Sequence, residues 1–271
     1  MTPHSVQIKI NDASLSIETG KVAKQADGAV VVRCGGTMVL STAVASRTPM
    51  EGRDFLPLTV EYRERAYAGG RIPGGFFKRE GRPDEKETLT CRLIDRPLRP
   101  LFPKDFRNEI QIINLVVSAD SDNDPDVLAM IGSSAAMSLS GIPFSGPVGA
   151  VRVALVDGKL IANPTYKQVA VSPLELVMAG NEDAILMVES GGKEIGEEQM
   201  LEALAFGHER CKELARIQKD LVARAAKPRW AFEAAGADPA LEARVKELAS
   251  AKVGQALSVH EIGRASCRER V

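Results

Sequence analysis

The part of this sequence best suited to bind another molecule lies between residues 63 and 107. Its centre, residues 71–83, reads RIPGGFFKREGRP, and we call it the basic loop. Exposed aromatic rings stack on unpaired bases, and arginine and lysine side chains hold phosphate groups. The surrounding glycines and prolines indicate a loop rather than a core strand. These residue types at this spacing predict a loop that binds a single-stranded nucleic acid.

The distribution of charge supports the same prediction. Residues 63–107 hold twelve basic and seven acidic residues, a local net charge of +5, whereas the whole chain of 271 residues has a net charge of −1. A local excess of this kind produces a positive field that attracts a polyanion. The plainer interpretation is that the adjacent phenylalanines anchor the loop in a core and that the mixed charges form a solvated face.

Five side chains of the basic loop are the first candidates for contact with the bound strand. We expect Phe76 and Phe77 to stack on its bases or to constrict around it, because aromatic faces accept any base. We expect Lys78, Arg79 and Arg82 to bind its phosphates. A nucleotide-binding P-loop is a weak alternative for the glycine pairs nearby, because no Gly-Lys-Ser/Thr follows them.

A helix is expected directly after the basic loop. Pro83 is tolerated at a helix start, and the acidic residues that follow it suit the positive end of the helix dipole. Pro97 disfavours helical geometry at the residue before it, so the helix should end near residue 95 or 96. Leu89 and Leu93 are expected to form the buried stripe.

Three further arginines belong to this helix and its end. Arg92, Arg96 and Arg99 are spaced at i, i+4 and i+7, so continued helical geometry would place them on one positive edge. We expect this edge to line the onward path of the bound strand. The alternative is that Arg92 and Arg96 pair with Asp95 and Glu85.

The acidic segment 119–126 has the spacing of a calcium-binding loop but lacks its key residues. Asp120, Asp122 and Asp124 alternate as such a loop requires, yet the sixth position is Pro125, where glycine is needed, and the twelfth is Ile131, where glutamate is needed. A structural role explains the segment better. We expect Asp124 to cap a helix that begins at Pro125.

The first turn of this second helix is also an unsuitable site for phosphate. A strand-to-helix turn offers free backbone amides to an anion. Here Asp124 and Asp126 already lie at the positive end of the helix, so a second negative charge is repelled.

Cysteine use and hydropathy restrict the class of protein. The four cysteines have no Cys-x-x-Cys spacing, which argues against zinc and disulfide frameworks and fits a reducing, cytoplasmic environment. No apolar run approaches the ~18 residues of a membrane span, and the first ten residues do not resemble a signal peptide. We therefore expect no membrane partner.

The order of predicted elements indicates an α+β fold. Strands are expected at 6–10, 14–18, 29–33, 37–45, 56–62, 109–117, 148–156, 160–161, 174–179 and 184–189. Helices are expected after the basic loop, at about 127–139, at 196–227 and at 240–256. Asp157-Gly158 is a hairpin signal.

Several motifs in this order resemble the bacterial polynucleotide phosphorylases. The basic loop is followed at 92–103 by RLIDRPLRPLFP, at 129–132 by AMIG, at 139–144 by LSGIPF and at 227–230 by KPRW. The similarity extends from roughly Val6 to about Ile262. It implies an α+β RNase PH-like domain (ribosomal protein S5 domain 2-like), followed by the beginning of an all-helical domain.

The resemblance also implies how the chain is divided. The family carries two RNase PH-like repeats joined by an all-α domain and followed by KH and S1 domains. The first repeat would be residues 1–208, with lobes at about 8–142 and 145–208. A helical connection at 209–236 and a truncated all-α domain at 237–262 would follow. Residues 263–271 break the helical pattern and are expected to be a foreign tail.

The activity implied by the resemblance is phosphorolysis of RNA. The family forms ring-shaped homotrimers through which single-stranded RNA passes, and it degrades that RNA from the 3′ end to nucleoside diphosphates in mRNA turnover. Inorganic phosphate is the co-substrate, and Mg²⁺ or Mn²⁺ assists. Degradosome components such as an endoribonuclease or an RNA helicase are possible partners.

The same resemblance implies that the catalytic centre lies outside this chain. The family's phosphate pocket and metal carboxylates belong to the second repeat, and the matching positions here are Pro125-Asp126-Val127, Asn163 and Val169. We therefore expect RNA binding and a trimer scaffold, with no catalytic and no metal-binding residue. One alternative is a non-catalytic RNA-binding ring subunit. Another, disfavoured by Asp126, Asn163 and Val169, is an autonomous enzyme of the smaller RNase PH type.

Overall fold

The structure is a computed structural model that describes residues 2–11, 13–75, 80–232 and 238–258. The chain divides into two compact units, Met1–Phe232 and Glu233–Val271. Among the helices of the described residues, none is both long enough and apolar enough to cross a membrane.

The first unit begins with a six-stranded sheet in the order β1-β2-β3-β4-β6-β5. All neighbouring strands are antiparallel except β5 and β6, which are parallel. Alternate residues along these strands are buried, as the sequence pattern predicts. The strands are β1 His4–Ile10, β2 Ala13–Thr19, β3 Gly28–Cys34, β4 Thr37–Pro49, β5 Leu58–Glu64 and β6 Asn108–Ser118.

Helix α2, Pro125–Leu139, is the central element of the core. Its residues are buried all round except Ser138, because it packs on β3 and β4 on one side and on β7 and α4 on the other. Gly132 makes this approach possible, since a Cβ there would lie 2.2 Å from Ser41 Oγ. The expected cap is confirmed: Asp124 is the N-cap, and Pro125 begins the helix.

Helix α1, Glu85–Leu98, follows the basic loop and differs in two ways from the sequence prediction. It continues through Pro97 into the short 3-10 helix η3, Arg99–Leu101. Its buried residues are Glu87, Thr90, Ile94, Pro97 and Leu98, whereas Leu89 is 50% exposed and Leu93 is half-buried. The predicted stripe is therefore wrong. A capping box between Asp84 and Glu87 turns the helix so that Glu87 lies inward.

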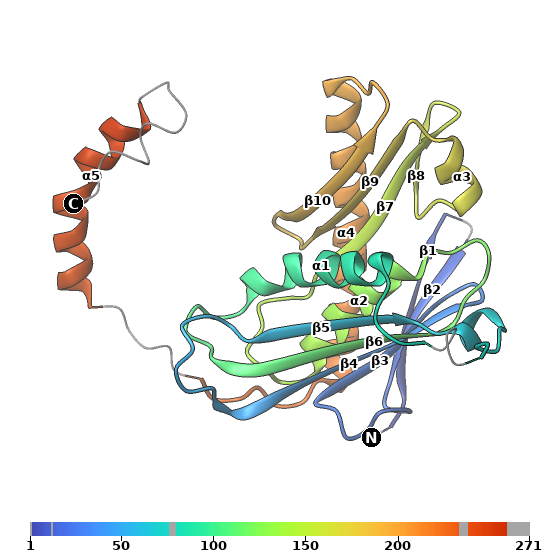
Figure 1. The fold of residues 1–271 in the computed structure, drawn as a ribbon, viewed down its shortest axis with the longest axis horizontal. Helices are drawn as coiled ribbons and strands as arrows, with labels where there is room; N and C mark the ends of the chain where they lie inside the picture. The colour runs from blue at the N-terminus through green and yellow to red at the C-terminus, as the bar shows by residue number, and fades with distance from the viewer. Residues whose placement is uncertain (1, 12, 76–79, 233–237, 259–271) are drawn as a thin grey trace. The chain divides into compact units, whose positions relative to one another are not determined.

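A second, four-stranded antiparallel sheet has the order β10-β9-β7-β8. Its strands are β7 Gly149–Val156, β8 Lys159–Ala162, β9 Leu174–Gly180 and β10 Ile185–Gly192. The predicted hairpin turn is confirmed, because Asp157 and Gly158 both have positive φ, 51° and 73°. Figure 1 shows α1 and α2 between the two sheets, and both helices contact each of them.

Two helices pack against the second sheet. The short α3, Tyr166–Val171, joins β8 to β9 and was not expected from the sequence. The long α4, Glu197–Ala225, packs on β7, β9 and β1. The expected domain boundary at residue 208 falls within this continuous helix and stays a prediction.

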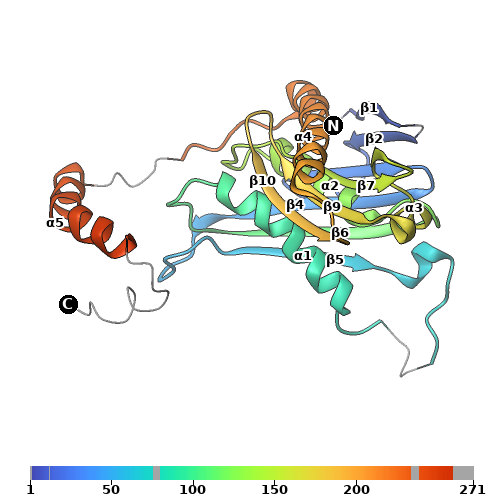
Figure 2. The ribbon, with the colours of Figure 1, turned by 90° about the horizontal axis from the view of Figure 1, so that it is seen from above.

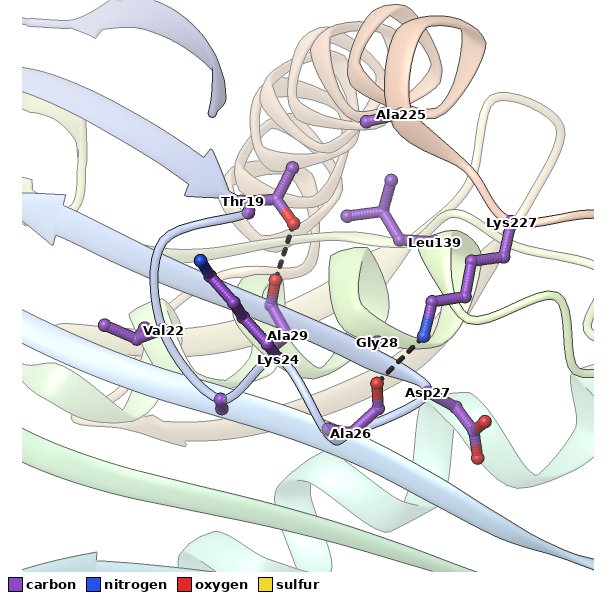
Figure 3. Close-up of a pocket in the computed structure, with 12 residues that line it drawn as sticks. Thr19, Val22, Lys24, Ala26, Asp27, Gly28, Ala29, Leu139, Ala225 and Lys227 are labelled. Carbon is purple, nitrogen blue, oxygen red and sulfur yellow. Dashed lines mark hydrogen bonds between the residues drawn. The ribbon is translucent and has the colours of Figure 1, made fainter. Parts of the chain in front are cut away.

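The segment after α4 is tied back to the first sheet. Lys227 Nζ donates a hydrogen bond to the carbonyl oxygen of Ala26, at 2.9 Å, beside a water-sized cavity (Figure 3). The Arg47 guanidinium lies 3.8 Å from the centre of the Trp230 ring, and Phe232 packs edge-on against Phe106. These contacts end the first unit. The second unit contains α5, Pro239–Leu257, capped by Asp238 and without a buried residue.

Candidate functional site

The described flanks of the basic loop lie on the surface. The chain leaves β5 through the 3-10 helix η1, Ala66–Gly69, and extends away from both sheets before it returns to α1 (Figure 2). Residues 69–75 and 80–86 are exposed, and Ile72 has an exposed fraction of 93%. A surface loop therefore stands where the glycine and proline pattern predicts one.

The predicted contact residues fall into two groups. Phe76, Phe77, Lys78 and Arg79 lie outside the described residues. Arg82 is described and exposed, on the returning side of the loop. The RNA contacts of all five side chains stay a prediction.

Arg99 is engaged by the protein itself. Its Nε and Nη2 atoms lie 2.9 and 2.8 Å from the two carboxylate oxygens of Asp95. Its Nη1 and Nη2 atoms also donate to the carbonyl oxygens of Leu56 and Leu58, at 2.9 and 3.2 Å. This bidentate geometry attaches the end of α1 to the start of β5. Arg99 therefore does not share one free positive edge with Arg92 and Arg96, and its RNA contact stays a prediction.

Arg92 and Arg96 are exposed on α1. Arg96 Nη1 lies 3.2 Å from Glu189 Oε2 on β10, and both side chains are at least half exposed. For Arg96, the partner is therefore Glu189 and not Asp95 or Glu85, the partners named in the alternative interpretation. An exposed pair of this kind is worth at most about 1 kcal/mol, so a phosphate could compete for Arg96.

A cluster of charged side chains lies where α1, α2 and the second sheet meet. Arg152 on β7 is at its centre, with Nη2 3.2 Å from Asp124 Oδ2 and 2.5 Å from Asp126 Oδ2. Arg152 Nη1 also pairs with Glu175 on β9. The Arg152 side chain is 11% exposed and that of Asp126 4%, so these charges are largely removed from water. We call these four residues the Arg152 cluster.

Lys86 joins this cluster to the first sheet. Its Nζ lies 2.8 Å from Glu64 Oε1 on β5 and 3.6 Å from Asp124 Oδ1. The Tyr62 hydroxyl donates to the same oxygen of Glu64, at 2.7 Å. Burial lowers the pKa of Lys86, whereas the hydrogen bond to Glu64 and the charge of Asp124 raise it. The two upward effects together are larger, so the pKa of Lys86 lies above its ordinary value.

Acidic groups outnumber basic groups in this network. Two cations, Arg152 and Lys86, face four carboxyl groups, and Asp126 is the most buried of these. Burial raises the pKa of Asp126 to about 6, against the opposing charge of Arg152. This carboxyl group therefore takes up a proton more readily than an exposed aspartate.

The first turn of α2 is closed to an added anion. The amide of Asp126 donates to Asp124 Oδ1 at 3.4 Å, and the amide of Val127 donates to Asp126 Oδ1 at 2.5 Å. Arg152, the nearest cation, is shared among three carboxylates. These contacts give a geometric reason for the expectation that phosphate does not bind at this turn.

An open cleft of about 620 Å³ lies above the Arg152 cluster. Lys86, Leu89 and Leu93 of α1 form one wall, and Val177 and Glu189 of the second sheet are on the other. The exposed face of α1 thus lines this cleft. It includes Leu89, which the sequence pattern wrongly predicted to be buried.

The residues matched to the family's metal ligands do not fit a metal. The side-chain oxygen of Asn163 accepts a hydrogen bond from the Arg152 backbone amide at 3.1 Å, and Val169 lies in α3. Within the described ranges, no group of three or more His, Cys, Asp or Glu side chains could hold a metal ion.

The acidic segment before α2 serves as a structural turn. The Asp120 carboxylate accepts hydrogen bonds from the backbone amides of Gly36, Asp122 and Asn123. Burial alone would raise its pKa, but these hydrogen bonds hold the pKa of Asp120 at about 2.

Arg152 and Glu175 are not among the residues that the sequence predicts for a site. A signal was present, because Arg152 is the single charged residue in the apolar run 147–156. A charge in a strand buried on both faces requires a buried partner, and Asp124 and Asp126 were available.

Models of one protein family match most of the first unit. Residues 13–143 match the 3′ exoribonuclease family, domain 1, and residues 146–210 match domain 2 of that family. The two matches are consecutive: the first covers β2 to α2, and the second covers β7 to the first half of α4. The chain belongs to the 3′ exoribonuclease family.

Curated relatives of this 3′ exoribonuclease family chain are similar over nearly its whole length. Polyribonucleotide nucleotidyltransferase of Geobacter sulfurreducens is 53% identical over 259 residues, which cover 96% of this chain and 37% of the relative. The protein of the same name from Geotalea uraniireducens is 52% identical over 254 residues, 94% of this chain and 36% of the relative. The chain thus spans little more than a third of the length of these relatives.

A solved structure shares the fold of this family member at low sequence identity. Rice (Oryza sativa) Rrp46 aligns with a TM-score of 0.61 and 14% identity, over 79% of this chain and 96% of the rice chain. The α+β, RNase PH-like fold expected from the sequence is confirmed.

Proposed function

We propose that this chain is the RNA-guiding part of a polyribonucleotide nucleotidyltransferase, a phosphorolytic exoribonuclease. The whole enzyme would degrade single-stranded RNA from the 3′ end, with inorganic phosphate as co-substrate and nucleoside diphosphates as products. The observation that carries this proposal is the 53% identity to a protein of that name over 96% of the chain.

Within that enzyme, the basic loop would hold the RNA strand. Arg82 and both described flanks are exposed, and residues 71–83 carry four cations and one acid. Phe76 and Phe77 would supply stacking surfaces, and Lys78, Arg79 and Arg82 would bind phosphates. Arg92 and Arg96, exposed on α1, would continue the path.

The bond-breaking chemistry would belong to the remainder of the enzyme. Two observations support this: the carboxylates of Asp124 and Asp126 occupy the amides of the α2 turn, and Arg152 is shared among three acids. Mg²⁺ or Mn²⁺ would bind in that remainder. The chain would also form part of a cytoplasmic homotrimer, with an endoribonuclease or an RNA helicase as degradosome partners.

The direct test is phosphate-dependent release of nucleoside diphosphates from labelled single-stranded RNA. We expect the full-length protein to release them only when phosphate is added, and residues 1–262 alone to release none. Release by residues 1–262 alone would favour the autonomous RNase PH-type enzyme. No release by the full-length protein, with RNA binding intact, would favour the non-catalytic ring subunit.

A further inference from the structure

Two carboxylates close the base of the basic loop, and Glu87 is the first. Glu87 Oε1 accepts a hydrogen bond from the backbone amide of Glu64 at 2.8 Å. Its Oε2 accepts from the amide of Asp84 at 2.9 Å and from Arg63 Nη1 at 3.3 Å. Glu87 is buried, so one side chain joins the end of β5, where the loop leaves, to the start of α1, where it returns.

Glu80 makes the second connection, nearer to the tip. Its Oε1 accepts from the backbone amide of Ala66 at 2.5 Å, and its Oε2 pairs with Arg65 Nη1 at 2.9 Å. The hydrogen bond from Ala66, together with Arg65, holds the pKa of Glu80 below its ordinary value, so the carboxylate stays charged at neutral pH. We call Glu80 and Glu87 the loop-base carboxylates.

Backbone contacts support both sides of this base. The amide of Ala119, after β6, donates to the carbonyl oxygen of Ala68 in η1 at 2.9 Å. Arg63 Nη2 donates to the carbonyl oxygen of Gly81 at 3.4 Å. The outgoing and returning segments are therefore attached to each other and to the first sheet.

We infer that Glu80 and Glu87 are positioning residues for RNA: they hold the outgoing and returning flanks of the basic loop together, which fixes Arg82 relative to the end of β5. This inference rests on the proposed function of the loop. When the two ends of the loop are already held together, RNA binding does not include the entropy cost of ordering them. If the two ends of the loop separate in part of the protein molecules, only the remaining molecules bind RNA. The apparent Kd then equals the intrinsic Kd divided by the fraction of molecules in which the ends are held together.

The sign of the effect separates positioning from simple electrostatics. A carboxylate that is merely near a polyanion repels it, so neutralising that carboxylate tightens RNA binding. A loop-base carboxylate that positions the loop gives the opposite result. Glu61 is a matched control, because it is exposed on β5, next to Tyr62, and no ion pair of its carboxylate is found in the described part of the chain.

The test compares Glu80→Gln with Glu61→Gln in the full-length enzyme. We expect E80Q to raise the Kd for a single-stranded RNA about fivefold, as a closed fraction of about one fifth would give. KM for RNA should rise with kcat unchanged. E61Q should leave Kd unchanged or lower it. Equal or tighter binding by E80Q would overturn the inference.

A readout without RNA checks that the base has opened. Trypsin can cleave after Arg71, Lys78 and Arg79 in the basic loop, whereas Pro83 protects the bond after Arg82. A loop whose base has opened should be cleaved faster. We expect E80Q to increase this rate while the melting temperature of the enzyme stays unchanged. An unchanged cleavage rate would contradict the closing role of Glu80.

A third variant separates failure of this inference from failure of the proposed function. Phe76→Ala/Phe77→Ala removes the proposed stacking surface and leaves the loop-base carboxylates in place. Weaker RNA binding by this variant, with normal binding by E80Q, would keep the loop as an RNA site and reject the positioning role. Normal binding by both variants would reject the RNA site itself.

Discussion

At the scale of single residues, the burial of Asp126 determines how the Arg152 cluster responds to pH. The folded-state pKa of this carboxyl group is raised to about 6, whereas an unfolded aspartate titrates near 3.9. Between these values the folded chain binds more protons than the unfolded chain. The contribution of Asp126 to the free energy of unfolding therefore decreases as pH rises from about 4 to about 6, and it is constant above that range.

This sign predicts the behaviour of Asp126→Asn. The substitution removes a charge from a cluster in which carboxyl groups outnumber cations. We expect the stability of D126N relative to the native chain to increase between pH 4.5 and pH 7.5, measured by urea unfolding at a series of pH values. Asp122→Asn, at an exposed aspartate two residues before the cap, should show no such trend. Parallel pH profiles of D126N and the native chain would show that Asp126 does not titrate in this window.

The aromatic side chains of the basic loop give a second prediction at this scale. Phe77→Ala should cost about 1–3 kcal/mol of RNA affinity in the assembled enzyme, because one base loses its stacking partner. Fluorescence anisotropy with a labelled single-stranded RNA measures the change. Phe55→Ala is a control, since Phe55 is an exposed phenylalanine outside the basic loop. Unchanged affinity and processivity in the Phe77 variant would remove the stacking role.

At the scale of elements, strands were easier to predict than the orientation of a helix. Alternation specified each strand to within a few residues, because one face of each sheet is buried. In α1 the positions of the leucines predicted the wrong buried face, because the face that is buried is formed by Glu87, Thr90 and Ile94. A buried glutamate is acceptable there because three donors satisfy its carboxylate. Those donors come from the loop base and are not visible in a helical pattern.

Pro97 shows the same limit of local rules. Its effect on the preceding residue predicted an end near residue 95 or 96, yet α1 continues to Leu98 and is followed by η3. Pro97 lies in the last turn and is buried with Leu98 against the core. Tertiary packing therefore outweighs the local preference.

The contact of α2 with β4 gives a prediction about stability. Gly132→Ala would place a Cβ 2.2 Å from Ser41 Oγ and 2.9 Å from Ser41 Cβ, so the helix or the strand must move. We expect a loss of about 1–3 kcal/mol in the free energy of unfolding, as overpacking usually costs. Gly254→Ala, on α5 with no atom within 4 Å of the added Cβ, should leave unfolding of the first unit unchanged. Equal stability of G132A and the native chain in urea would mean that this contact is looser than the structure has it.

At the scale of the whole molecule, the fold and the family could be predicted from the sequence, whereas contacts between residues far apart in the chain could not. The motifs from the basic loop to Trp230 identified the fold and the family, because they are long and occur in one order. The Arg152 cluster and Lys86 join residues from α1, the start of α2, β7 and β9 that are far apart in the chain. Their pairing depends on how the two sheets pack, and no local pattern contains that information.

The described part of the chain has features suited to RNA binding but not to phosphate binding at the α2 turn. The described surface offers exposed cations around the basic loop, whereas the α2 turn is filled by the protein's own carboxylates. These observations support our proposal that this chain binds the RNA and that the reaction with phosphate takes place in the rest of a longer enzyme.

The most direct test of this account is the salt dependence of RNA binding by the full-length enzyme. Lys78, Arg79 and Arg82 are changed together to glutamine, and the logarithm of the binding constant is plotted against the logarithm of salt concentration. We predict that the slope becomes shallower by about 0.7 for each RNA phosphate that is no longer bound, because fewer counterions are released from single-stranded RNA. A slope identical to that of the native enzyme would show that these cations do not hold RNA.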